Sequence, residues 1–146
     1  MAYYKDFTVC DYVDGSMWTC RLIAIGWIEH SKSYPKGNAD LLFIRKVNTL
    51  RANFLDAFPH KCFRGLHDCS LCEAAGRLED SHFNLYIPLG GLVFVAPGRI
   101  DHYLEVHNYL PPESFISAVM DCPSPLTEEY RELMRAANRG DRKSVV

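Results

Sequence analysis

Two pairs of candidate metal ligands are the feature of this sequence that most limits how the chain can fold. Cys69 and Cys72 form a C-x2-C motif, and His102 and His107 form an H-x4-H motif after 29 intervening residues. Two cysteines at this spacing can both face one ion from a tight turn, and two histidines separated by three to five residues often supply the remaining ligands of a tetrahedral zinc site. The pattern therefore predicts one zinc ion bound by Cys69, Cys72, His102 and His107.

The spacing of the two histidines raises a geometric difficulty. On a regular α-helix of 3.6 residues per turn, side chains five positions apart are rotated by about 140° from each other. Both imidazoles can reach one ion only if the helix loosens near its end, which the following Pro111-Pro112 favours. If the helix stays regular, His67 is expected to replace one of the pair, and Cys62 is a further candidate in the same segment.

A redox-active dithiol and a pair of plain free thiols are the alternatives for Cys69 and Cys72. In thioredoxin-like proteins such a pair lies between a strand and the start of a helix, whereas a polar stretch without helical periodicity follows Cys72. Disulfides are disfavoured because residues 1–6 show no secretory signal. Three further cysteines are expected to be small buried apolar residues: Cys10, Cys20 and Cys122.

Runs of β-branched and aromatic residues predict strands over 17–28, 83–87 and 92–95. The last two flank Gly90-Gly91, which is typical of a β-hairpin. A knuckle, a hairpin and a ligand-bearing helix, in this order, are the layout of a treble-clef zinc finger. We therefore expect an α+β fold in one domain over residues 1–146, with a treble-clef-like zinc site and additional helices. The zinc-binding core is expected at about 60–120, the C-terminal helix at about 124–139 and a frayed tail at 140–146.

Helical periodicity predicts a long helix from residue 39 to Pro59, with Asn38 as its N-cap. Three basic residues are expected on its solvated face: Arg45, Lys46 and Arg51. Shorter helices are predicted over 99–109 and 113–120. A last helix is expected to start near Ser124-Pro125 with four residues directed inward: Leu126, Tyr130, Leu133 and Met134.

The overall charge argues against a protein that binds phosphates non-specifically. Sixteen Lys and Arg residues stand against 18 Asp and Glu, which gives a formal net charge of −2 and a pI near 6.3. No stretch approaches the 18 apolar residues of a membrane span, so no membrane association is expected. The sequence thus predicts a cytoplasmic protein.

Four strings in the chain resemble an uncharacterised family of small bacterial proteins that is common in actinobacteria. They are Ile25-Gly26-Trp27, Arg64-Gly65-x-His67-x-Cys69-x2-Cys72, Val95-Ala96-Pro97 and His102-Tyr103-x3-His107-x-Tyr109-x-Pro111-Pro112-x2-Phe115. The likeness extends from about Tyr3 to Met120 and leaves the last helix outside. It implies His67, Cys69, Cys72, His102 and His107 as the functional set, without Cys62. It implies no activity.

Three functions are compatible with such a site. A structural zinc in a module that binds another protein is favoured by the near-neutral charge and by the absence of an obvious nucleophile–base pair. A nucleic-acid-binding zinc domain would need Arg and Lys gathered on one face, but these residues are scattered in sequence. A zinc-dependent hydrolase would need an open metal position and a base, for which Glu105 and His67 are the candidates. If the zinc is structural, no residue is expected to be catalytic.

Overall fold

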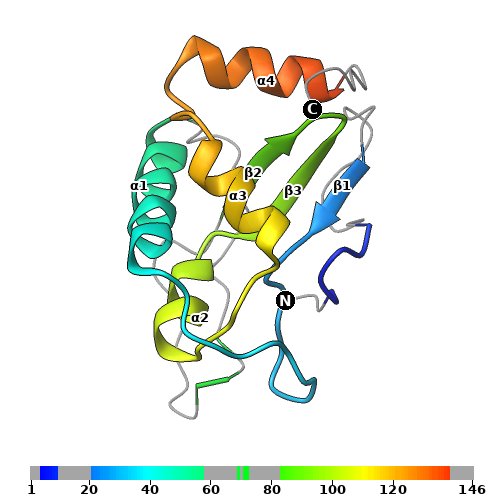
Figure 1. The fold of residues 1–146 in the computed structure, drawn as a ribbon, viewed down its shortest axis with the longest axis vertical. Helices are drawn as coiled ribbons and strands as arrows, with labels where there is room; N and C mark the ends of the chain where they lie inside the picture. The colour runs from blue at the N-terminus through cyan, green and yellow to red at the C-terminus, as the bar shows by residue number, and fades with distance from the viewer. Residues whose placement is uncertain (1–3, 10–20, 58–68, 70, 73–82, 139–146) are drawn as a thin grey trace.

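The fold is α+β, as the sequence predicts. The computed structural model describes residues 4–9, 21–57, 69, 71–72 and 83–138 (Figure 1). In these residues the elements follow one another as β1 (Arg21–Ala24), α1 (Leu41–Ala57), β2 (Asn84–Leu89), β3 (Leu92–Pro97), α2 (Ile100–Val106), α3 (Glu113–Asp121) and α4 (Glu128–Asn138).

The strands form a three-stranded sheet in the order β1-β3-β2. β2 and β3 make the predicted antiparallel hairpin, in which Leu89 pairs with Leu92 across Gly90-Gly91. Gly90 has a φ of 59°, in the left-handed region that two-residue hairpin loops require and that glycine adopts without steric strain. β1 pairs with β3 in parallel, so a long crossover connects them, and this crossover contains α1 and the cysteine pair.

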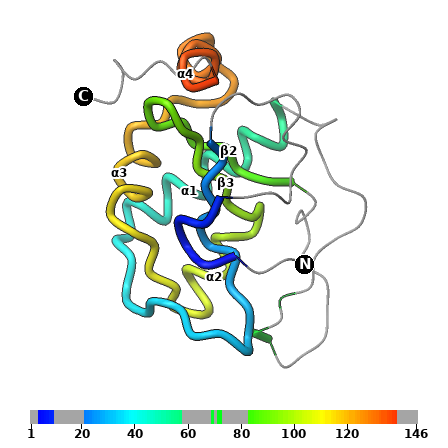
Figure 2. Tube along the Cα trace, turned by 90° about the vertical axis from the view of Figure 1, so that its right-hand side faces the viewer, coloured from blue at the N-terminus to red at the C-terminus, as the bar shows by residue number. Residues whose placement is uncertain are grey.

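Side chains on the two faces of the sheet belong to two apolar clusters. On one face, Leu85 and Phe94 pack with residues of α1, α2 and α3. On the other face, Val93 and Val95 pack with Trp27 and with β1. α4 lies across the hairpin end of the sheet, at the opposite end of the molecule from α2 (Figures 1 and 2). It contributes Tyr130 to the first cluster and Ala137 to the second.

The predicted first strand, expected to extend to residue 28, ends at Ala24 in the structure. β1 covers Arg21–Ala24, and residues 17–20 lie outside the described part of the chain. Gly26 ends the extended backbone because its φ is +82°, a conformation that L side chains rarely adopt. A Cβ at this position would lie 2.8 Å from Ile100 Cδ1, so the glycine also lets the start of α2 pack against the turn.

Two predicted helix starts need correction. Asp40, not Asn38, caps α1, since its Oδ1 accepts the Leu42 N–H at 3.3 Å and its carboxylate suits the positive end of the helix. α4 begins at Glu128 instead of near Ser124-Pro125, because Thr127 Oγ1 accepts the Tyr130 N–H at 3.3 Å and caps the helix.

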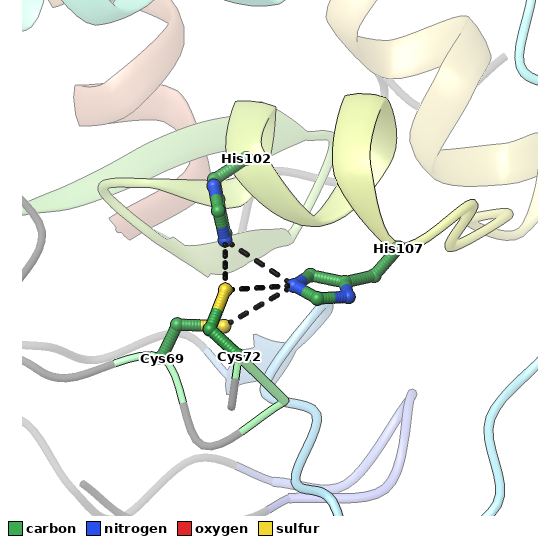
Figure 3. Close-up of side chains that lie close together, drawn as sticks. All are labelled: Cys69, Cys72, His102 and His107. Carbon is green, nitrogen blue, oxygen red and sulfur yellow. Dashed lines mark hydrogen bonds between the residues drawn. The ribbon is translucent and has the colours of Figure 1, made fainter. Parts of the chain in front are cut away.

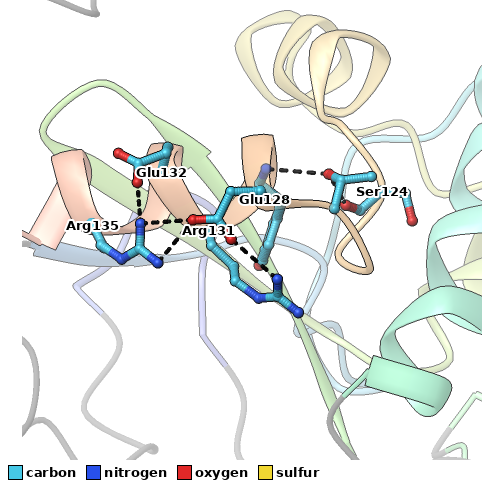
Figure 4. Close-up of polar contacts among 7 residues, drawn as sticks. Ser124, Glu128, Arg131, Glu132 and Arg135 are labelled. Atoms are coloured by element: carbon cyan, nitrogen blue, oxygen red, sulfur yellow. Dashed lines mark hydrogen bonds and ion pairs between the residues drawn. The ribbon is translucent and has the colours of Figure 1, made fainter.

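Because α4 starts at Glu128, only some of the residues predicted to face inward from this helix do so. Tyr130 is buried and Met134 packs against the core, as predicted. Leu126, also expected to face inward, is 49% exposed because it lies in the turn before the helix. The outer face of α4 carries ion pairs that join Glu128 to Arg131 and Arg135, and Arg135 to Glu132 (Figure 4).

A buried ion-pair cluster joins α1 to α2, and it corrects the prediction that Arg51 is solvated. The Asp101 side chain is 9% exposed, and its Oδ1 lies 3.2 Å from Arg51 Nε and 2.9 Å from Arg99 Nε. Arg51, itself 13% exposed, also donates to the Gly98 carbonyl. The two guanidinium groups therefore satisfy the buried carboxylate and fix the start of α2 against α1.

We predict that Asp101→Asn lowers the free energy of unfolding by about 3 kcal/mol, because it leaves two largely buried guanidinium groups without their counter-charge. Urea unfolding monitored by circular dichroism measures this change. The control is Glu128→Gln, which removes an acceptor of solvent-exposed ion pairs and should leave the free energy of unfolding nearly unchanged. Equal effects of the two substitutions would contradict a special role for the Asp101 cluster.

Candidate metal centre

The four predicted ligands come from two short segments that the fold brings together. Cys69 and Cys72 lie on a tight turn, in which the Cys72 N–H donates to the Cys69 carbonyl at 3.3 Å. His102 lies in the first turn of α2, and His107 is the C-cap residue of the same helix. α2 directly follows the β2–β3 hairpin, so the sheet positions both histidines.

The side chains of these residues converge on one point (Figure 3). Cys72 Sγ lies 3.3 Å from His102 Nε2 and 3.4 Å from His107 Nε2. Cys69 Sγ lies 3.4 Å from His107 Nε2, and the two Nε2 atoms are 3.2 Å apart. All four ligand atoms lie within 4.8 Å of one another, close enough to hold a metal ion.

These separations match the edges of a tetrahedron around a metal ion. With metal–sulfur bonds of about 2.3 Å and metal–nitrogen bonds of about 2.0–2.1 Å, ideal tetrahedral angles place S and N about 3.5 Å apart and two N atoms about 3.3 Å apart. The observed S···N distances of 3.3 to 3.4 Å and the N···N distance of 3.2 Å are within a few tenths of an ångström of these values.

Hydrogen bonds alone do not account for the cluster. Cys72 Sγ, His102 Nε2 and His107 Nε2 are each within 3.4 Å of the other two. A neutral imidazole nitrogen carries at most one proton, and that N–H points along one direction in the ring plane. Three mutual contacts among such atoms cannot all be well-directed hydrogen bonds, whereas one cation between them would use the lone pair of every atom.

The end of α2 resolves the difficulty posed by the five-residue spacing. His107 has φ −112° and ψ 9°, outside the helical region, and Asn108 follows with a φ of 51°. The Tyr103 carbonyl accepts both the His107 N–H at 3.2 Å and the Tyr109 N–H at 3.1 Å, so the chain turns sharply away from the helix axis. The helix loosens where the sequence analysis required it, and this turn brings His107 to the same side as His102.

A loop distant in sequence holds this turn in place. Tyr34 Oη donates to the His107 carbonyl at 2.9 Å. The Gly37 N–H donates to the Asn108 carbonyl at 2.9 Å, and the Leu110 N–H donates to the Pro35 carbonyl at 3.0 Å. These bonds hold the backbone from His107 to Leu110 in place.

Burial sets the protonation of the cluster. Desolvation lowers the pKa of His107, and desolvation followed by the charges of His107 and Arg99 lowers the pKa of His102. Both imidazoles are therefore neutral at pH 7, the form that binds metals. Desolvation raises the pKa of the Cys69 thiol, so metal binding has to displace a proton from that sulfur.

The other candidates divide between those the structure describes and those it does not. His67, Cys62, Cys10 and Cys20 lie outside the described residues. Cys122 is buried in the core, as predicted. Glu105, the candidate base of a hydrolase, is exposed and accepts a hydrogen bond from Asn48 Nδ2 on α1 at 3.4 Å. It is not a member of the cluster of four candidate ligands.

Sequence reasoning missed three residues that position the site: Asp101, Arg51 and Tyr34. Asp101 directly precedes His102, and this proximity was the only available signal for it. Nothing local in the sequence indicates that Arg51 or Tyr34 would meet α2, because each contact joins residues at least 50 positions apart along the chain.

Comparison with known proteins assigns the chain to a family. Residues 2–120 match the model of a domain of unknown function, DUF7919, so the chain belongs to this uncharacterised family. All four cluster residues lie within the match, whereas α4 lies beyond it. Neither the curated proteins nor the solved structures contain a match to the sequence. Among the described residues, no helix combines the length and the apolar character needed to cross a bilayer.

We predict that native Cys122 resists alkylation by iodoacetamide at pH 8. Burial raises the pKa of its thiol to about 12, so at pH 8 the sulfur is protonated as well as inaccessible. Mass spectrometry of tryptic peptides after a timed reaction provides the measurement. The urea-unfolded protein is the control and should be labelled at Cys122. Rapid labelling of Cys122 in the native protein would show that the contacts of α3 observed here do not persist in solution.

Proposed function

We propose that this protein binds one zinc ion through Cys69, Cys72, His102 and His107, and that the zinc is structural. The carrying observation is that three S···N distances and one N···N distance among these four atoms match edges of a tetrahedron, with all four atoms within 4.8 Å of one another. A tetrahedral S2N2 donor set is typical of zinc. The arrangement resembles a treble clef in its order of cysteine turn, hairpin and helix.

The number and kind of ligands favour a structural over a catalytic ion. A catalytic zinc usually has three protein ligands and an open position for water or substrate. Here four side chains can occupy all four positions of a tetrahedron. The hydrolase alternative is also weakened, because Glu105, the candidate base that the structure describes, accepts a hydrogen bond from Asn48 on α1.

Charge distribution favours a protein partner over a nucleic acid. Four of the described arginines are paired with acidic residues: Arg51 and Arg99 with Asp101, and Arg131 and Arg135 with Glu128. Exposed apolar side chains, which are common at protein interfaces, include Leu41 and Leu42 at the start of α1 and Val106 at the end of α2. We infer an interaction domain stabilised by zinc.

Elemental analysis of the purified protein should find one zinc ion per chain, and Cys72→Ser or His107→Ala should reduce this to near zero. Because structural zinc contributes on the order of 10 kcal/mol in small zinc domains, both variants should melt at much lower temperature than the parent chain, as should the parent chain after treatment with a chelator. Replacement of zinc by Co²⁺ should give the visible absorption of a tetrahedral, thiolate-bound ion.

Cys122→Ser is the matched control, because it removes a buried thiol outside the cluster and should keep the zinc. Retention of one zinc per chain and of thermal stability in Cys72→Ser would refute the site. If His107→Ala keeps zinc while His67→Ala loses it, the ligand set changes and His107 is not a ligand.

The nucleic-acid alternative predicts a different result. We expect the zinc-loaded protein to bind labelled duplex DNA and single-stranded RNA more weakly than the 10⁻⁴ to 10⁻⁶ M typical of non-specific binding at physiological salt. Fluorescence anisotropy over a series of salt concentrations measures this. Micromolar binding that falls steeply with salt would favour the nucleic-acid-binding function over a protein-interaction module.

A further inference from the structure

A pocket of about 430 Å³ lies between the N-terminal segment and the loop that leads to α1. Its volume is within the range of small-molecule sites, and none of the four cluster residues lines it. One wall is formed by residues 4–6 and the other by residues from Ile28 to Pro35. In Figure 1 residues 4–6 belong to the dark blue segment and residues 28–35 to the blue-to-cyan loop.

Two tyrosine rings in the lining are held in fixed orientations. The Tyr4 ring packs edge-on against Trp27, with centroids 5.9 Å apart, and the Tyr4 N–H donates to the Trp27 carbonyl at 3.2 Å. The Tyr34 ring lies 6.3 Å from that of Tyr109, and its hydroxyl is bound to the His107 carbonyl. Because their positions are already fixed, a flat ligand can contact these rings without the entropy loss of ordering them.

The charges that line the pocket favour an anion. Lys5 contributes an ammonium group from the first wall and Lys32 from the second. Among the described lining residues Asp6 is acidic, but its oxygens already accept the Gly26 N–H at 3.0 Å and the Tyr109 hydroxyl at 2.7 Å. The carboxylate therefore holds the wall together, and the two lysines give this described part of the lining a net positive charge.

We propose that this pocket binds a small organic anion that carries a flat ring, such as an aromatic carboxylate or an aryl phosphate. The ring would lie against Tyr4 and Tyr34, with buried Ile28 beside them, and the anionic group would face Lys5 and Lys32. Ammonium groups form charge-assisted hydrogen bonds with such anions, and aromatic faces contribute apolar contact. The proposal does not depend on the zinc site.

Phenyl phosphate is a suitable probe because it combines one ring with one anionic group. Titrated into the ¹⁵N-labelled full-length chain, it should cause saturable amide shifts at residues 4–6 and 32–34. Lys5→Glu and Lys32→Glu should each weaken binding by about fivefold, the upper range for an exposed ion pair. Lys46→Glu is the matched control, because it changes the charge equally but lies on α1 outside the pocket. Its affinity should equal that of the parent chain.

Two further ligands and one variant separate the contribution of the ring to binding from that of the anionic group. Benzyl alcohol keeps a ring without the anion, and inorganic phosphate keeps the anion without the ring; both should bind at least about fivefold more weakly than phenyl phosphate. Tyr4→Leu should weaken phenyl phosphate but leave inorganic phosphate unchanged.

Equal binding of phenyl phosphate and inorganic phosphate would overturn the proposed ligand class. Shifts that never saturate, or an equal loss of affinity in Lys46→Glu, would overturn the pocket as the site. Zinc content is measured on the parent chain and on every variant. Absence of zinc from the parent chain would be a failure of the metal site alone, whereas weaker binding of phenyl phosphate by a variant that keeps the zinc content of the parent is an effect on the pocket.

Discussion

The candidate metal centre depends on the buried carboxylate of Asp101. It lies on α2, a helix of only seven residues, and an isolated helix of this length is not stable in water. Tertiary contacts must therefore fix it, and the ion pairs of Asp101 with Arg51 and Arg99 join its first turn to α1 and to the end of β3. Because His102 is the next residue, the same contacts position the first imidazole of the cluster.

The second imidazole is positioned by a different kind of constraint. His107 reaches the cluster because the chain leaves the helix there, and the loop around Tyr34 holds the resulting turn by three hydrogen bonds. The same Tyr34 ring lines the proposed anion pocket, so one loop supports the backbone of a candidate metal ligand and forms the wall of a separate site. An occupant of the pocket would thus contact a residue that is hydrogen-bonded to the backbone of His107.

The sequence correctly predicted those features that depend on residues close together in the chain. The Gly90-Gly91 hairpin, the buried Cys122 and the meeting of Cys69, Cys72, His102 and His107 follow from turn chemistry, burial preference and ligand spacing. The errors concern residues whose environment is set by distant partners. An arginine on an amphipathic helix is normally solvated, whereas the Arg51 side chain is only 13% exposed because it pairs with Asp101 and donates to Gly98, about 50 positions later. The two helix starts were predicted wrongly for a local reason. Other polar residues that can cap a helix lie a few positions from the observed caps, Asp40 and Thr127.

α4 lies outside the family-matched region but packs against the same sheet. The match to DUF7919 ends at residue 120, yet Ala137 is fully buried against the second face and Tyr130 Oη donates to the Tyr86 carbonyl at 2.6 Å. α4 therefore covers the hairpin end of the sheet, while α2 and the cysteine turn lie at the other end (Figure 2). The proposed zinc ion and α4 would thus each stabilise one end of the molecule.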